Sequence, residues 1–293
     1  MKILMTGATG FIGLALCKQL LANGHEVTAV VRPDSQRKYK IPDKVTVQEL
    51  SFDNLDKISG QFDICYHLAW NGTSGHQRDD FIVQADNIKY TINMIKVSKK
   101  LGCRKFIGAG SQAEYGNVRK LCTEENVAKP FTMYGAAKLS AYHIGRITAA
   151  QENISFVWPR IYSIYGVGEN DGTLINYLID CFKKNITPEL SCCENMWDYM
   201  YISDCVNALI MLGENEKTEG IYNVSSGEPM ILKEYVNIVR KIISPDAYID
   251  FGKIKTDIDH TFWLEPDVRR LKNIGFSTKV SFHEGIKKKL GLD

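Results

Sequence analysis

A glycine-rich segment near the start of the chain has the spacing of a phosphate-binding turn. Residues 5–13 read Met-Thr-Gly-Ala-Thr-Gly-Phe-Ile-Gly, follow an apolar start and open into a helical pattern. Glycines at a strand-to-helix turn let the backbone approach a pyrophosphate, which then lies on the unpaired N–H groups of the helix N-terminus. Such a pattern also occurs by chance, so it needs support from elsewhere in the chain. The contacts it predicts for a dinucleotide cofactor are Gly7, Thr9, Gly10, Phe11, Ile12 and Gly13.

A Tyr-x-x-x-Lys pair, Tyr134 and Lys138, provides that support. Residues four apart on a helix lie on one face, about one turn from each other. A phenol with a pKa of about 10 is a poor acid–base catalyst at neutral pH, and a nearby ammonium or a positively charged nicotinamide would lower that value. Lys138 would also bind the nicotinamide ribose. An ordinary helix with a buried Tyr and an exposed Lys is the structural alternative.

Ser111 adds a third polar group at the end of an expected strand, in the run Gly108-Ala109-Gly110-Ser111. Parallel sheets gather their ligands at the carboxyl ends of their strands. There the Ser111 hydroxyl would donate to a substrate carbonyl and complete a Ser–Tyr–Lys set, although a lone serine at such a place is more often part of a turn. The sequence therefore predicts Ser111, Tyr134 and Lys138 as the catalytic residues.

The tip of the second expected strand indicates which dinucleotide is bound. NAD sites often carry an Asp or Glu at this point, bonded to the ribose 2′-hydroxyl. This chain has Arg32, whose guanidinium can pair bidentately with a 2′-phosphate, so NADP(H) is preferred. Asp34 keeps NAD(H) as an alternative, and a merely surface-exposed Arg32 remains a further one.

The elements that position these groups alternate between strand and helix. This alternation predicts βαβ units, a mostly parallel Rossmann-type doubly wound sheet, and an α/β fold. The expected strands are Lys2–Met5, Glu26–Val31, Val45–Glu49, Asp63–His67, Lys105–Ala109 and Ser155–Arg160, with helices at Gly13–Asn23, Asp80–Leu101 and Tyr134–Glu152. After Tyr165-Gly166 the pattern becomes shorter and mixed, with helices at 174–184, 232–243 and 282–289, strands at 199–202 and 222–224, and a helix capped by Ser203. We expect a dinucleotide-binding domain at 1–163, to which 197–225 returns, and a smaller mixed α/β substrate lobe at 164–293.

Composition excludes several other classes of protein. The 293 residues are 44% hydrophobic and carry a net charge of +2, which favours neither nucleic acid nor an anionic membrane surface as partner. The first residues are expected to form a strand and not a secretory leader, and no apolar run in the sequence reaches bilayer length. Five of the eight cysteines, Cys17, Cys65, Cys103, Cys181 and Cys205, lie among apolar residues. We expect a cytoplasmic protein with reduced thiols and, because Cys192-Cys193 lacks partners at suitable spacing, no metal site.

Taken together, the ordered motifs resemble the extended short-chain dehydrogenases/reductases that modify nucleotide sugars. The resemblance runs through residues 6–13, 67–69, 87, 111–116, 134–138, 159–166, 197–204 and 267–276. It implies cofactor contacts from Leu68, Ala69, Asn87 and Pro159, a lobe that binds the nucleoside diphosphate, and a homodimer formed through the helices at 80–101 and 134–152. Substrate contacts implied in this way are Ser111, Ser163, Trp197, Arg269 and Arg270.

Three departures from the family pattern refine this expectation. Gln112-Ala113 replaces the acidic pair with which dehydratases drive elimination, so dehydration is disfavoured. Ser163 replaces an Asn. Trp197 replaces an Arg that contacts the diphosphate, so Arg269 or Arg270 would supply that charge, and Trp197 either stacks on the nucleobase or simply packs.

The resulting hypothesis is an NADPH-dependent reductase of a nucleoside-diphosphate-4-keto-6-deoxyhexose. Tyr134 would protonate the developing alkoxide, Ser111 would stabilise it and Lys138 would tune Tyr134. The alternatives are an NAD(P)-dependent nucleotide-sugar 4-epimerase, which needs the same three residues, and a non-catalytic dinucleotide-binding sensor, whose relatives typically lose the Tyr or the Lys.

Overall fold

The main sheet has eight strands, and every pair of neighbours in it is parallel. The computed structural model describes residues 1–255 and 263–292. From one edge of the sheet to the other the strands are β11 (Gly220–Val224), β7 (Ser155–Ile161), β5 (Lys105–Gly108), β4 (Ile64–His67), β1 (Lys2–Thr6), β2 (Glu26–Val31) and β3 (Thr46–Glu49). The short β6 (Gly110–Ser111) pairs with β7 beyond the end of β5. The strand order reverses between β1 and β4, which confirms the doubly wound fold.

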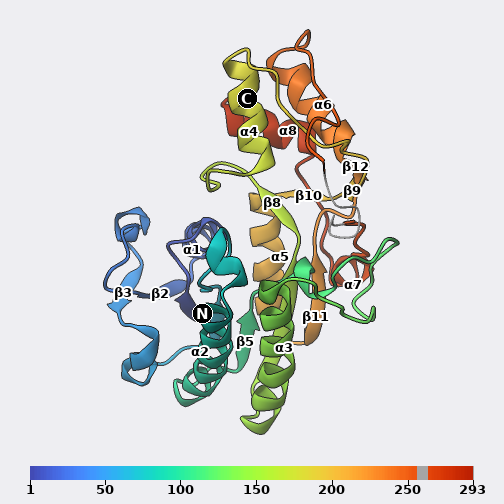
Figure 1. Cartoon of the computed structure of the whole chain (residues 1–293). Coiled ribbons are helices and arrows are strands. Elements are labelled where there is room, and N and C mark those ends of the chain that lie inside the picture. The colour runs from blue at the N-terminus through green and yellow to red at the C-terminus, as the bar shows by residue number, and fades with distance from the viewer. Residues whose placement is uncertain (256–262, 293) are drawn as a thin grey trace.

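Helices cover both faces of this sheet because its strands alternate apolar side chains between two cores. Ile3 and Met5 of β1 belong to one buried cluster and Leu4 to the other. The helices on the first face are α1 (Phe11–Ala22) and α5 (Ile202–Glu214), and those on the second are α2 (Phe81–Lys100) and α3 (Met133–Gln151). Figure 1 shows α2 and α3 lying side by side.

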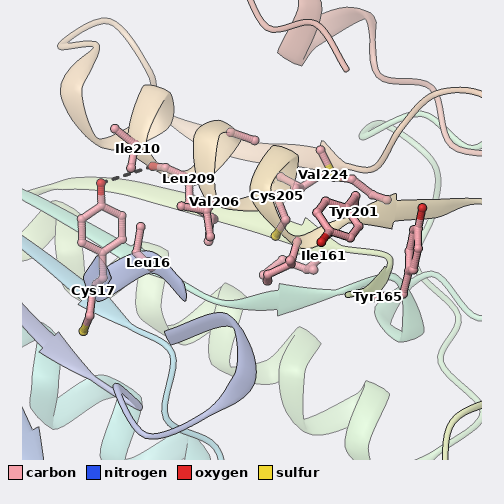
Figure 2. Packing of buried hydrophobic residues seen from close by; sticks show 14 of the residues in the cluster. Leu16, Cys17, Ile161, Tyr165, Tyr201, Cys205, Val206, Leu209, Ile210 and Val224 are labelled. Atoms are coloured by element: carbon pink, nitrogen blue, oxygen red, sulfur yellow. Dashed lines mark hydrogen bonds between the residues drawn. The ribbon is translucent and has the colours of Figure 1, made fainter. Parts of the chain in front are cut away.

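Helix α5 is seated on the sheet by a continuous apolar contact, shown in Figure 2. Val206 and Leu209 of α5 pack in the same buried cluster as Leu16 of α1 and Val224 at the end of β11. The Tyr66 hydroxyl in β4 donates to the Leu209 carbonyl at 3.2 Å. The segment 202–224 therefore belongs with the main sheet, although it lies far from β1 in the sequence: α5 covers one face of the sheet and β11 is its edge strand.

Side chains cap several of the helices. Asp80 accepts hydrogen bonds from the N–H groups of Ile82 and Val83 at the start of α2, and Thr132 accepts one from Gly135 at the start of α3. The predicted cap at Ser203 is wrong. Helix α5 begins at Ile202, directly from the preceding strand, with Tyr201 at its N-cap position and no side-chain cap.

The smaller lobe lies above the main sheet in Figure 1 and combines short strands with helices. Its helices are α4 (Leu174–Lys183), α6 (Leu232–Ile243) and α8 (Phe282–Leu290), whereas the short α7 (Arg269–Lys272) packs against β11 of the main sheet. Two small sheets pair β8 (Ser163–Tyr165) with β10 (Tyr199–Tyr201), and β9 (Met196–Trp197) with β12 (Met230–Ile231). Tyr165, Tyr199, Tyr235 and Phe282 form its aromatic core.

The five cysteines expected in the core, Cys17, Cys65, Cys103, Cys181 and Cys205, are all buried. Within residues 1–255 and 263–292, no helix is both long enough and apolar enough to cross a membrane.

Candidate active site

A pocket of about 410 Å³ opens at the carboxyl ends of β1, β2 and β4, where the strand order reverses. This is where doubly wound sheets bind their ligands. Six predicted cofactor contacts from the glycine turn line it, namely Gly7, Thr9, Gly10, Phe11, Ile12 and Gly13. Leu68, Ala69 and Arg32, predicted from other elements, line the same pocket.

The glycine turn has the geometry that a dinucleotide pyrophosphate requires. Gly7 has φ +77°, and a Cβ at Gly13 would lie 2.1 Å from the Gly7 carbonyl oxygen, so neither position accepts a side chain without rearrangement. Gly10 is the N-cap of α1 and leaves the first N–H groups of the helix without a side-chain cap. Uncapped N–H groups at a helix N-terminus bind phosphate oxygens. The residues of this turn therefore fit the dinucleotide.

Two guanidiniums stand beside the pocket at the end of β2. Arg32 follows the strand directly and lies 3.4 Å from the Asn71 side-chain oxygen and 3.7 Å from Asp34. Arg37, which the sequence reasoning did not select, lines the same pocket and donates to the Asn170 side chain at 3.1 Å. The only signal for Arg37 in the sequence is its position five residues after Arg32.

Asn87, predicted as a cofactor contact, binds the backbone of a loop that lines the pocket. It lies on α2, is buried, and forms hydrogen bonds with the Asn71 N–H at 2.8 Å and the Asn71 carbonyl at 2.9 Å. Asn71 itself lines the pocket, together with Trp70 and Thr73 of the same loop. Asn87 thus fixes the loop that follows β4.

The three predicted catalytic residues come together beyond this pocket. Tyr134 and Lys138 lie on the first turns of α3, and Ser111 ends β6. The Lys138 ammonium donates to the Ala109 carbonyl at 2.6 Å and lies 3.5 Å above the Trp70 ring and 5.7 Å from the centre of the Tyr134 ring. The Ser111 hydroxyl accepts from the Ala113 N–H at 3.2 Å and lies close enough to Tyr134 to lower the pKa of its phenol.

Burial dominates the electrostatics of this group. It lowers the pKa of Lys138 to about 7, with the negative charge of Glu114 acting in the opposite direction. Burial also raises the pKa of Tyr134, and the negative charge of Glu114 acts in the same direction. The Ser111 hydroxyl and the positive charge of Arg78 lower this pKa. The expectation that the Lys138 ammonium brings the Tyr134 pKa below its ordinary value is therefore not met by the protein alone.

A buried ion pair lies directly behind Ser111. One Glu114 carboxylate oxygen accepts from the Ser111 N–H at 2.8 Å and from the Trp158 indole at 2.9 Å. The other accepts from Arg160 at 2.7 Å, and both charged side chains are almost completely buried. Together with the Ser111 hydroxyl, Glu114 forms a capping box on the short turn at 112–114.

Three predicted contacts lie away from the pocket. Pro159 is buried within β7, in register with Tyr222 of β11. The strand ends two residues later at Ile161, and Ile161 lines the pocket. Arg269 is bonded through its guanidinium to Asp267. Arg270 donates to the Glu219 carbonyl beside the first residue of β11, at the opposite end of the sheet from the glycine turn.

Trp197 and Ser163 lie where the smaller lobe meets the main sheet. Ser163 begins β8 and is in register with Tyr199. Trp197 packs beside Tyr115 and Tyr162, and its indole N–H is buried with no partner in the described part of the chain. A second cavity, of about 590 Å³, lies further into this lobe and is lined by Arg119, Lys255, Trp263 and the segment 191–195.

Comparisons with known proteins agree with this geometry. CDP-abequose synthase of Salmonella muenchen is 24% identical over 303 residues, which cover 99% of this chain and 97% of that protein. UDP-glucuronic acid decarboxylase 1 of Danio rerio is also 24% identical, over 98% of this chain and 71% of its own length.

Solved structures share the fold over the whole chain. MoeE5 in complex with UDP-glucuronic acid and NAD has a TM-score of 0.87 at 22% identity, and covers 100% of this chain and 98% of its own. UDP-glucose 4-epimerase of Thermotoga maritima has a TM-score of 0.87 at 21% identity with the same coverage. The model of the NAD dependent epimerase/dehydratase family matches residues 3–225, from β1 to the end of β11, and the chain belongs to this family.

Proposed function

We propose that the protein is an NADPH-dependent reductase of the 4-keto group of a nucleoside-diphosphate-4-keto-6-deoxyhexose. The observation that carries the proposal is the assembly of Ser111, Tyr134 and Lys138 next to the glycine-turn pocket, where Lys138 contacts Ala109 of its lining, with Gln112-Ala113 in place of an acidic pair. Full-length similarity to an enzyme named CDP-abequose synthase supports a nucleotide-sugar substrate.

In the proposed mechanism, a bound NADPH supplies the hydride that reduces the carbonyl carbon. The Tyr134 phenol gives its proton to the oxygen of the carbonyl as negative charge develops there. Ser111 is already oriented by the Ala113 N–H, so its own O–H can be directed at the same oxygen and stabilise it. Lys138 donates to the Ala109 carbonyl and would bind the nicotinamide ribose. Its lowered pKa makes it easier to deprotonate than an exposed lysine.

The preference for NADPH rests on the charge at the end of β2. Arg32 and Arg37 place two guanidiniums at the pocket, and Ser35 adds a hydroxyl between them. A 2′-phosphate can accept charge-assisted hydrogen bonds from all three groups. Asp34 beside Arg32 and the NAD bound by MoeE5 support the alternative, NAD(H).

We propose that the nucleoside diphosphate occupies the cavity of the smaller lobe. Arg119 and Lys255 are the cations in its lining, and they replace Arg269 and Arg270 as candidates for the diphosphate contact. The cavity also presents the Trp263 ring, a surface on which a base can stack. Gln112 supports a sugar contact nearer Tyr134, because its side-chain oxygen is buried without a donor in the described residues.

A nucleotide-sugar 4-epimerase is the second candidate, favoured by the likeness of the fold to epimerases such as that of Thermotoga maritima. It needs the same three catalytic residues, so geometry separates the two candidates poorly. A dinucleotide-binding sensor is the third candidate, and the retention of both Tyr134 and Lys138 weighs against it.

We also propose a homodimer formed through α2 and α3. The exposed apolar side chains on or beside these helices are Phe81, Ile82, Met133, Ile144 and Ile147. Apolar side chains gathered on one helix pair are typical of a subunit interface.

The reaction is tested by supplying 4-keto-6-deoxyhexoses on different nucleoside diphosphates and following the absorbance of NADPH. Oxidation of one NADPH per 6-deoxy sugar formed supports the reductase. Interconversion of nucleoside-diphosphate hexoses without net loss of NADPH identifies the epimerase. Binding without turnover across the panel would identify the sensor.

A further inference from the structure

Arg78 lies on the face of the Tyr134 ring. Its guanidinium carbon is 4.2 Å from the ring centre, and one of its nitrogens donates to the Thr73 carbonyl at 2.8 Å. The same phenol ring and the Trp70 ring form a T-shaped pair, with 6.1 Å between ring centres. Arg78 belongs to the short turn at His76–Asp79, which connects the pocket loop after β4 to α2.

Two cations therefore lie near Tyr134, but they differ in how their charge is held. Lys138 is buried, donates to a carbonyl, and has a pKa lowered to about 7, so its charge is partly lost at neutral pH. The guanidinium of an arginine stays protonated at any pH in use. The other groups that act on the phenol are the Ser111 hydroxyl, which lowers its pKa, and the Glu114 carboxylate, which raises it.

We propose that Arg78 is a positioning residue for Tyr134: its guanidinium holds the phenol ring against Trp70 and provides a fixed positive charge over the ring of this catalytic candidate. A guanidinium stacked on an aromatic face is attracted by the ring and restricts its rotation. The fixed charge favours the phenolate that forms when Tyr134 gives up its proton. In this arrangement Lys138 mainly binds the Ala109 carbonyl and the cofactor ribose. Arg78 then stabilises the Tyr134 phenolate, which was the role first expected of Lys138.

The inference rests on the proposed catalytic role of Tyr134, so its test includes a measurement that needs no turnover. The protein is labelled with fluorotyrosine, and the Tyr134 resonance is assigned by its absence from Tyr134→Phe. Its titration is then followed by fluorine NMR in the unmodified protein, in Arg78→Gln and in Arg78→Lys. Lys89→Gln, which removes an exposed charge beside Tyr90 on α2, controls for net charge.

Arg78→Gln is expected to raise the pKa of Tyr134 by about one unit, the lower end of the effect of an opposite charge at this distance. Arg78→Lys should restore most of the difference, and Lys89→Gln should cause none. The limb of the pH profile of kcat/KM that Tyr134 governs should move to higher pH by the same amount, whether the phenol acts as an acid or the phenolate as a base.

An unchanged Tyr134 titration in Arg78→Gln overturns the inference whatever reaction the protein catalyses. A shifted titration with an unshifted kcat/KM profile also overturns it, because the charge then has no part in catalysis. A protein that turns over none of the nucleotide sugars refutes the proposed function instead, and the titration still decides whether Arg78 controls Tyr134.

Discussion

Glu114 and Arg160 form an ion pair in the interior, 2.7 Å apart, and the other oxygen of that carboxylate accepts the Ser111 N–H. One buried carboxylate therefore joins the backbone of a catalytic candidate to β7. The Arg160 guanidinium in turn lies 4.1 Å from the centre of the Tyr115 ring, whose hydroxyl donates to Asn223 of β11 at 2.7 Å. The position of Ser111 thus depends on three strands.

Removing one partner of this pair should be strongly destabilising. Glu114→Gln leaves the Arg160 charge buried and unpaired, which typically costs about 3–5 kcal/mol of unfolding free energy. Glu216→Gln is the matched control, because it breaks an exposed pair of the same 2.7 Å length with Arg104 and should cost about 1 kcal/mol or less. Urea denaturation measures both, and equal losses would show that the buried pair adds nothing.

Tyr134→Phe should lower turnover by about 10²- to 10⁴-fold, the usual contribution of general acid–base catalysis. The ring still packs against Arg78 and Trp70, so the Kd for the dinucleotide should change little. Steady-state kinetics and a fluorescence titration with the cofactor separate the two effects. Turnover at the unmodified rate would make Tyr134 a structural residue.

Cofactor preference should depend on both arginines after β2. The unmodified protein is expected to bind NADPH more tightly than NADH, and Arg32→Ala or Arg37→Ala should each weaken NADPH binding about tenfold, or 1.4 kcal/mol, while leaving NADH nearly unchanged. Calorimetric titration of the unmodified protein and of each variant with each dinucleotide gives the six dissociation constants needed. Equal affinities of the unmodified protein for the two dinucleotides would rule out the preference.

The diphosphate contact should map to the smaller lobe. Arg119→Ala, in the second cavity, is expected to raise the KM for the nucleotide sugar about tenfold through loss of a charge-assisted hydrogen bond. Arg270→Ala removes the same charge at the amino end of β11 and should leave KM unchanged. A raised KM in Arg270→Ala with an unchanged KM in Arg119→Ala would instead indicate that Arg270 contacts the diphosphate, as first expected from the sequence.

Acid should destabilise the fold through His67. Burial, together with the nearby charge of Lys138, lowers the pKa of His67 from 6.5 to about 3. Between these pH values His67 is protonated in the unfolded chain and neutral in the folded protein. The unfolding free energy therefore falls as the pH drops from 6.5 toward 3. From pH 7 to pH 5 the unmodified protein should lose about 2 kcal/mol more than His67→Gln, measured by urea denaturation at both values. An identical pH dependence would exclude His67 as the cause.

Local patterns were enough to predict the site where function depends on a single turn or helix. The glycine spacing predicted the pocket wall, and the spacing of Tyr134 and Lys138 predicted two side chains on one face of α3. The catalytic roles of these residues stay predictions until activity is measured. Strand boundaries were correct to within one or two residues because β-branched runs end at glycine or polar residues.

Contacts set by tertiary structure could not be predicted in this way. Arg78 reaches Tyr134 only because the loop after β4 folds back over α3, and no short-range pattern encodes that path. The sequence did not indicate that Arg270 lies near the amino end of β11, because sequence order does not say which end of the sheet a helix approaches. Strand β7 continues to Ile161, one residue beyond the expected end at Arg160, and the cofactor contact of Pro159 within it stays a prediction.

The position of β11 at the edge of the main sheet has a consequence for how the protein must be made. Residues 220–224 cover β7 through five register positions, although the first segment of the expected dinucleotide-binding domain, to which 197–225 returns, ends at residue 163. A ribosome that has released only that first segment presents β7, with its apolar Phe156, Val157 and Trp158, as an open strand edge. Such edges pair readily with other chains, so the nascent protein is exposed to aggregation until β11 emerges. A fragment cut at residue 163 would keep that open edge permanently.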